Sequence, residues 1–256
     1  EGFKNSLLEI KLKDGSLAHD IKDVPHGRLE YIHYYSKSLG ATNQAVVYLP
    51  PNYVMDQQKK YPVFYLISGT TDTEEVYYKV GRVNYILDNL LAEKKAKEMI
   101  VVLPYGNPMK LKVPPLPPPE GGAMDPAAKP KDAPSGAIGG GRGDVFSQDL
   151  INDLMPYSEQ NYRTINNRDS RAIGGFSRGG NQALFNGLSH LDKFSYLCSY
   201  SSFTSTDIPE VYDNAAETNK KIHLFWLGVG TDDFLYGNAR DYMAFLDQKG
   251  IHSVKE

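Results

Sequence analysis

The chain has 256 residues, of which 41% are hydrophobic and 23% are charged, and its formal net charge is -3 at pH 7. These values are ordinary for a globular protein with one large core, and the weak negative charge gives no reason to expect nucleic acid or an anionic membrane as a partner. No apolar run reaches the roughly 18 residues that a membrane-spanning helix needs.

The first predicted elements are two paired strands. Residues 28–36 read as one strand and residues 43–49 as the next, with the turn Lys-Ser-Leu-Gly between them. Pro50 and Pro51 then end the pair. The sheet is therefore expected to open with an antiparallel pair at its N-terminal side.

A strand, a helix and a second strand follow. Residues 63–67 are continuously apolar, as expected of a parallel strand that is buried on both faces. Residues 80–92 carry apolar side chains at helical spacing, and residues 99–103 form another apolar run. This order predicts a right-handed crossover between parallel strands.

Residues 105–143 interrupt the pattern, because they are rich in proline and glycine and show no periodicity. A loop of this length inside a compact domain is usually functional or mobile, so we expect it to border a binding site.

The remaining chain returns to alternating elements. A helix is predicted over residues 147–162, and the strand at 171–174 leads into a helix over 181–188. Strands are predicted at 196–201 and 222–227, a helix at 241–248, and a last strand from Ile251. The only cysteine, Cys198, lies in one of these strands and is expected to be a buried, unreactive thiol. We predict one α/β domain over residues 1–256, with a mostly parallel sheet and helices on both faces.

The motif Gly-x-Ser-x-Gly joins the strand at 171–174 to the helix that follows it. Gly175, Ser177 and Gly179 occupy its three fixed positions. Between a strand and a helix this motif is typical of a nucleophile elbow, in which the serine is held in a strained turn. Ser177 is therefore the candidate nucleophile.

A serine nucleophile also needs an acid, a base and donors for the oxyanion. In the α/β-hydrolase order the acid follows a later strand, and the loop after residues 222–227 offers Asp232 and Asp233. One oxyanion donor is expected to be the backbone N–H of Arg178, and the second that of Thr70, in the loop after residues 63–67.

Several segments together resemble the esterase D-like α/β-hydrolases, and more narrowly the carbohydrate esterase family 1 feruloyl and acetylxylan esterases. They span nearly the whole chain and comprise residues 23–27, 34–40, 61–66, 81–90 and 146–162, with the Gly-Phe-Ser-Arg-Gly-Gly elbow. The resemblance implies an α/β-hydrolase fold and selects Asp233 over Asp232 as the acid.

The resemblance also implies a function. It implies a serine carboxylesterase that removes feruloyl or acetyl groups from plant cell-wall xylan without a metal or organic cofactor. It further implies a secreted or cell-surface protein, with a carbohydrate-binding module as a possible upstream domain. Two other functions stay open: hydrolysis of S-formylglutathione or a siderophore ester, and non-catalytic carbohydrate binding on the same fold.

Two positions depart from the family pattern. Ser68 precedes Gly69 where the family usually has histidine, so the support that this histidine gives the oxyanion loop is expected to be lost. The catalytic histidine of the family follows the last strand, and that position falls past Glu256. His252 matches a non-catalytic position. We therefore expect either a sequence that stops short of its base or a natural pseudoenzyme.

Overall fold

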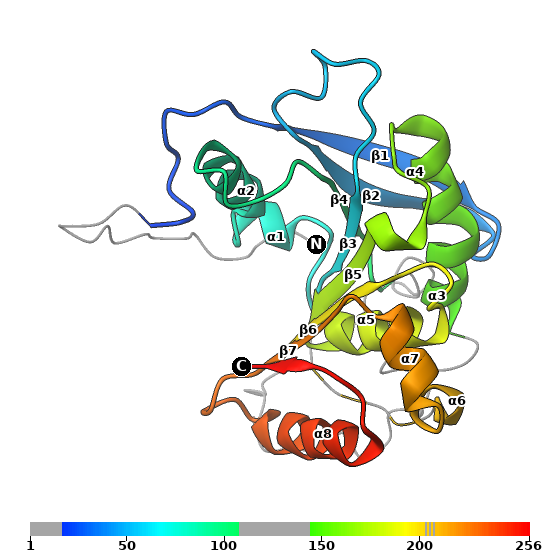
Figure 1. The fold of residues 1–256 in the computed structure, drawn as a ribbon. Coiled ribbons are helices and arrows are strands. Elements are labelled where there is room, and N and C mark those ends of the chain that lie inside the picture. Colours follow the sequence, from blue (N-terminus) through cyan, green and yellow to red (C-terminus); the bar gives the residue numbers. More distant parts are fainter. Residues whose placement is uncertain (1–16, 108–143, 203, 205, 207) are drawn as a thin grey trace, which may run out of the picture.

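The computed structural model describes residues 17–107, 144–202, 204, 206 and 208–256. Within these residues, eight strands form one mixed sheet in the order β1-β2-β4-β3-β5-β6-β7-β8 (Figure 1). From residue 108 onward, the long loop predicted over residues 105–143 lies outside the described part of the chain.

The strands confirm the predicted α/β architecture. Their bounds are β1 (Arg28–Ser36), β2 (Ala41–Leu49), β3 (Val63–Ile67), β4 (Ile100–Pro104), β5 (Arg171–Phe176), β6 (Tyr196–Tyr200), β7 (Leu224–Gly228) and β8 (Val254–Lys255). The pairs β1–β2 and β2–β4 are antiparallel, and every other neighbouring pair is parallel. The sheet is thus mostly parallel and carries the antiparallel N-terminal pair that the sequence predicts.

The helices differ from the predictions mainly at their ends. They are α1 (Val76–Lys79), α2 (Val83–Ala92), α3 (Val145–Asp149), the π-helical η2 (Leu150–Leu154), α4 (Met155–Asn161), the 3-10 helix η3 (Arg168–Ser170), α5 (Arg178–Ser189), α6 (Pro209–Tyr212), α7 (Ala215–Lys221) and α8 (Tyr236–Lys249). The helix predicted from residue 80 begins at Val83, because Arg82 has a positive φ of 51°. The helices predicted at 181–188 and 241–248 begin earlier than predicted, and the short helices α1, η3, α6 and α7 were not predicted.

The helices cover the two faces of the sheet unequally. In Figure 1, α1 and α2 lie on one side of the sheet, and α3, α4, α5 and α7 lie on the other. The larger core packs side chains of α5 and α8 against the sheet, whereas the smaller core packs α1 and α2 against β2, β3 and β4. Helices therefore cover both faces, as predicted. None of the described helices is long and apolar enough to cross a membrane.

The helix predicted over residues 147–162 runs from Val145 to Asn161 as α3, η2 and α4, and its middle part is a π-helical turn. Its inward residues Phe146, Leu150 and Leu154 are buried. Two carboxylates beside them bind the β1–β2 hairpin. Asp149 accepts hydrogen bonds from the Tyr34 hydroxyl at 2.7 Å and from an Asn43 amide at 2.9 Å, and Asp153 accepts from Ser36 and Ser38. These hydrogen bonds therefore hold the β1–β2 hairpin against the helical segment.

Cys198 lies in β6 and is half-buried rather than fully buried as predicted, but desolvation by the surrounding protein raises the pKa of its thiol to about 11. Because of this raised pKa, the thiolate fraction of Cys198 at pH 8 should be about 100-fold below that of a free cysteine. Only the thiolate reacts with alkylating agents. We expect iodoacetamide to modify native protein at least about 100-fold more slowly than protein unfolded in urea, as followed by intact mass. Equal rates would contradict the assignment of Cys198 as an unreactive thiol.

Candidate active site

The nucleophile elbow is a tight turn between β5 and α5. The strand ends at Phe176, the helix begins at Arg178, and Ser177 between them has φ 57° and ψ -122°. A positive φ is unfavourable for a residue with a Cβ atom, so the neighbouring structure must hold Ser177 in this conformation. Its amide donates to the Tyr200 carbonyl at 2.9 Å, and the residue is half-buried. Ser177 therefore has the conformation that the motif predicts.

The two glycines of the motif are required by backbone contact. A Cβ atom at Gly175 would lie 2.4 Å from the backbone carbon and oxygen of Gly179. A Cβ atom at Gly179 would lie 2.2 Å from the carbonyl oxygen of Ile67. Side chains do not tolerate contacts this short, so β5, α5 and the end of β3 approach closely only because both residues are glycine.

The predicted oxyanion donors lie at the ends of adjacent strands. Ile67 pairs with Gly175, so the loop after β3 runs beside the elbow, and a Cβ atom at Gly69 would lie 3.3 Å from the Phe176 ring. No hydrogen-bond acceptor is found among the described residues for the amide N–H of Thr70 or of Arg178. The positive end of the α5 dipole adds to the attraction for a developing oxyanion.

Two side chains hold the loop after β3, and sequence reasoning identified neither. The Tyr77 hydroxyl donates to the Ile67 carbonyl at 3.0 Å, and the Arg178 guanidinium donates to the Gly69 carbonyl at 3.1 Å. By contrast, the Ser68 hydroxyl is buried and has no hydrogen-bond partner within the described residues. The sequence offered one weak signal, which is that Arg178 directly follows the nucleophile.

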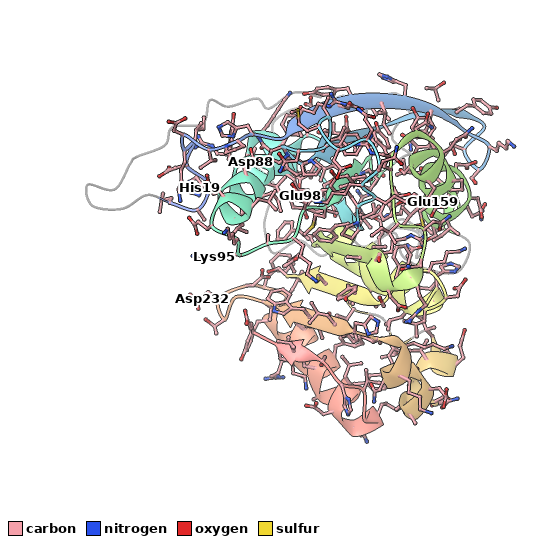
Figure 2. All side chains as sticks on the ribbon, turned by 45° about the horizontal axis from the view of Figure 1, so that its top comes forward. His19, Asp88, Lys95, Glu98, Glu159 and Asp232 are labelled. Carbon is pink, nitrogen blue, oxygen red and sulfur yellow. The ribbon has the colours of Figure 1, made fainter. Side chains whose placement is uncertain are left out.

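The two candidate acids differ in their surroundings. Asp233 is half-buried, and one of its oxygens accepts a hydrogen bond from the Leu235 amide at 2.8 Å. Asp232 is exposed and lies at the outer tip of the loop after β7 (Figure 2). β7 is separated from β5 by β6, and Phe176, Tyr200 and Gly228 are in register across the three strands. Both acids thus follow the same sheet edge as Ser177, but no described contact joins either of them to the serine.

All six histidines of the chain lie within the described residues, and none is beside Ser177. His19 and His26 lie near the C-terminal end of α2, where His26 contacts the Asp88 carboxylate at 2.9 Å (Figure 2). His33 is exposed on the outer strand β1. The chain passes from the end of α2 to the start of β4, so the end of α2 lies at the amino edge of the parallel strands. His19 and His26 therefore lie at that edge, whereas the elbow lies at the carboxyl edge.

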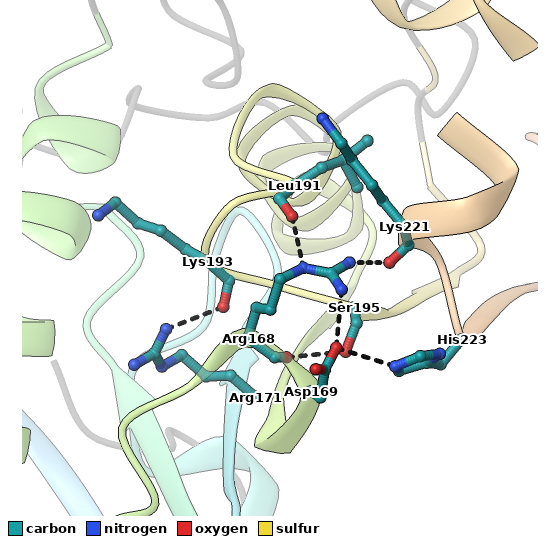
Figure 3. A network of polar contacts seen from close by, with 8 residues as sticks. All are labelled: Arg168, Asp169, Arg171, Leu191, Lys193, Ser195, Lys221 and His223. Atoms are coloured by element: carbon teal, nitrogen blue, oxygen red, sulfur yellow. Dashed lines mark hydrogen bonds and ion pairs between the residues drawn. The ribbon is translucent and has the colours of Figure 1, made fainter. Parts of the chain in front are cut away.

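The three later histidines also lie at the opposite edge. His190 directly follows α5, which starts at the nucleophile and ends at the far side of the sheet. His223 precedes β7 and contacts Asp169 at 2.9 Å, in a polar network that also contains Arg168 (Figure 3). His252 precedes β8. The structure thus places Ser177, Arg178 and the loop that carries Thr70 at the same edge of the sheet, but it supplies no base from the described residues.

No group of three or more His, Cys, Asp or Glu side chains that could hold a metal ion is found in the part of the chain that the structure describes.

Comparison with family models shows to which family the chain belongs. Residues 36–248 match the model of the family described as "Putative esterase". The chain belongs to this esterase family. Taken together with the relatives and solved structures described next, this match confirms the predicted resemblance to esterase D-like hydrolases of the carbohydrate esterase family 1 type and the predicted fold.

Individual relatives agree with the family assignment. Over 194 residues, this esterase is 31% identical to an endo-1,4-beta-xylanase/feruloyl esterase of Xylanibacter ruminicola; the match covers 75% of this chain and 24% of the relative. The chain therefore spans about a quarter of the length of that curated relative.

Solved structures share the fold. A CE1 ferulic acid esterase from Anaeromyces mucronatus, in complex with ferulic acid, aligns with a TM-score of 0.72 at 24% identity, over 92% of this chain and 84% of its own. An S-formylglutathione hydrolase from Staphylococcus aureus aligns with a TM-score of 0.64 at 15% identity, over 92% and 90%.

The glycine contacts of this esterase predict a large stability loss in Gly179→Ala. The added Cβ atom would meet the Ile67 carbonyl, and relieving that contact should cost at least about 2 kcal/mol. Gly237→Ala is the matched control, because a Cβ atom there meets nothing within 4 Å and alanine is favoured in a helix. Urea denaturation compares the two, and similar midpoints would contradict the packing argument.

The acid assignment predicts unequal effects of two substitutions. We expect Asp233→Asn to lower the turnover of an aryl ester by the full protein more strongly than Asp232→Asn, because Asp233 is half-buried and held by the Leu235 amide. Steady-state kinetics of both variants decide between them. An equal or reversed order would refute Asp233 as the acid.

Proposed function

We propose that this esterase is a serine carboxylesterase that hydrolyses feruloyl or acetyl esters on xylan of the plant cell wall. The observation that carries the proposal is the strained Ser177 turn, set beside two backbone amides that have no acceptor among the described residues. A nucleophile next to free donors is the arrangement that acyl transfer needs.

The reaction follows from this geometry in two halves. The Ser177 hydroxyl oxygen attacks the ester carbonyl carbon, and its proton passes to a histidine base. The amides of Thr70 and Arg178 hold the oxyanion of the tetrahedral intermediate. The intermediate collapses as its bond to the sugar oxygen breaks, the histidine gives its proton to that oxygen, and the sugar leaves with a free hydroxyl group. Water then attacks the acyl-serine by the same route and releases ferulate or acetate. Asp233 would orient the histidine, and no metal or organic cofactor takes part.

The base is the part of the proposal that the described residues do not supply. We expect it to follow Glu256 in the full protein. β8 runs parallel to β7, and the Glu256 carbonyl accepts a hydrogen bond from the Val229 amide at 3.0 Å. A residue after Glu256 would therefore emerge at the same sheet edge as Ser177 and Asp233. Without such a residue, the fold would bind ester-bearing sugar without turnover.

The choice of substrate rests on the relatives. A xylanase/feruloyl esterase and a ferulic acid esterase support an aromatic acyl group on a cell-wall sugar. S-formylglutathione hydrolases share the fold at lower identity, so a small thioester is the second candidate. A secreted or cell-surface location, and a carbohydrate-binding module as a further domain, would fit the xylan substrate.

One substrate panel tests the proposal. The full protein is assayed with methyl ferulate, acetylated xylan and S-formylglutathione at equal concentrations. Preferential hydrolysis of methyl ferulate or acetylated xylan supports the proposed substrate class, and faster hydrolysis of S-formylglutathione would replace it with the second candidate. Retention on xylan without hydrolysis of any ester would favour the non-catalytic alternative.

Replacement of the nucleophile gives the second test. Ser177→Ala should abolish ester hydrolysis while leaving thermal stability near that of the wild type. Loss of a catalytic serine typically lowers turnover by several orders of magnitude. Turnover above about a hundredth of the wild-type value would exclude Ser177 as the nucleophile.

A further inference from the structure

We propose that the side chain of Arg178 is the positioning residue of the oxyanion hole, because it fixes the peptide unit between Gly69 and Thr70. This inference rests on the proposed function, since it assigns Thr70 as one of the two oxyanion donors. It also accounts for the departure at Ser68, where the family usually has the histidine that supports this loop.

The contact itself is short and buried. The Arg178 side chain is 3% exposed, and its Nη2 atom donates to the Gly69 carbonyl oxygen at 3.1 Å. Within the described residues no carboxylate lies within 4.0 Å of the guanidinium, although Asp144 and Asp72 are near enough to favour its charge. Burial of a cation without a direct ionic partner opposes folding. An arginine that only filled space at this position would therefore destabilise the fold.

The bonded carbonyl determines where the oxyanion donor points. The Gly69 C=O and the Thr70 N–H belong to the same peptide unit, and no cis peptide bond occurs in the described chain. In a planar trans peptide the two groups point in opposite directions. A hydrogen bond that holds the Gly69 oxygen toward Arg178 therefore fixes the Thr70 N–H on the other side. If this peptide rotated, its carbonyl oxygen would enter the site in place of the donor.

The other side chains near this loop leave that peptide free. Tyr77 binds the Ile67 carbonyl, two peptide units before it, and the Ser68 hydroxyl has no partner among the described residues. The Asp72 amide reaches the same Gly69 oxygen, but at 3.4 Å and from within the loop itself. Arg178 thus provides the restraint that comes from outside the loop.

The first residue of α5 would then organise both halves of the hole. Its backbone N–H is one proposed donor, and its guanidinium orients the other. Gln182, one helical turn later, offers a matched comparison, because its amide donates to the Gly106 carbonyl at 3.0 Å in the loop after β4. Gln182 is as deeply buried as Arg178 and binds a loop carbonyl in the same way, but it does not contact the Gly69–Thr70 peptide.

The experiment compares Arg178→Met and Gln182→Met in the full protein. Each removes one buried donor and keeps an unbranched side chain. We expect Arg178→Met to lower kcat for an aryl acetate by about 10- to 100-fold with KM changed less than about 3-fold, because misplacing one oxyanion donor costs on the order of 100-fold in rate. Gln182→Met should keep kcat within about 3-fold at a similar loss of Tm. Equal losses of kcat in the two variants would overturn the proposal.

A second readout does not depend on activity. Hydrogen exchange of the Asp72 amide, which donates to the same Gly69 oxygen, should be at least about 10-fold faster in Arg178→Met than in Gln182→Met. If the wild type hydrolyses no ester, the proposed function fails, while the exchange comparison still decides the positioning role. If Arg178→Met does not fold, Arg178→Lys replaces it, and a loss of kcat with unchanged Asp72 exchange would overturn the proposal.

Discussion

The site depends on the close backbone approach of three segments at the elbow. The end of β3, the end of β5 and the start of α5 meet at Gly175 and Gly179, where no side chain fits. This approach holds Ser177 in a strained conformation and sets the loop after β3 beside the N-terminus of α5. The nucleophile and both proposed donors therefore depend on one packing constraint, which uses backbone atoms only.

Much of the fold could be predicted from the sequence, because buried parallel strands are continuous apolar runs. Residues 63–67 and 28–36 were predicted with the bounds of β3 and β1. Short helices such as α6 and α7 could not be predicted, since four to seven residues carry too little periodicity. The elbow was recognisable because its motif needs fixed residue types at fixed spacing. The hydrogen bond from Arg178 to Gly69 was not, because it joins residues far apart in the sequence and leaves no local pattern.

The two edges of the sheet have different chemistry. At the carboxyl edge, the amides of Thr70 and Arg178 have no acceptor among the described residues. At the amino edge, the guanidinium groups of Arg168 and Arg171 bind the backbone carbonyls of Leu191, Lys221 and Lys193 (Figure 3). These two guanidinium groups are paired with backbone carbonyls, so they stabilise the ends of the elements. Groups left unpaired at the other edge are available to a substrate.

The π-helical turn between α3 and α4 has a consequence for the phase of the whole helix. An α-helix advances about 100° per residue, so residues four apart drift slowly around its axis. The wider turn at Leu150–Leu154 absorbs this drift, and it lets Phe146, Leu150 and Leu154 all face the core while Ser158 stays buried. Deleting one residue from the turn would make the helix regular and leave the residues on both sides of it in their present phase, whereas deleting one residue from α3 or α4 would rotate everything on one side of the deletion by about 100°. In that second case either the apolar row or a carboxylate that holds the outer hairpin would face solvent. The π-helical turn is therefore the one place in this helix where a residue can be lost without changing which side chains face the core.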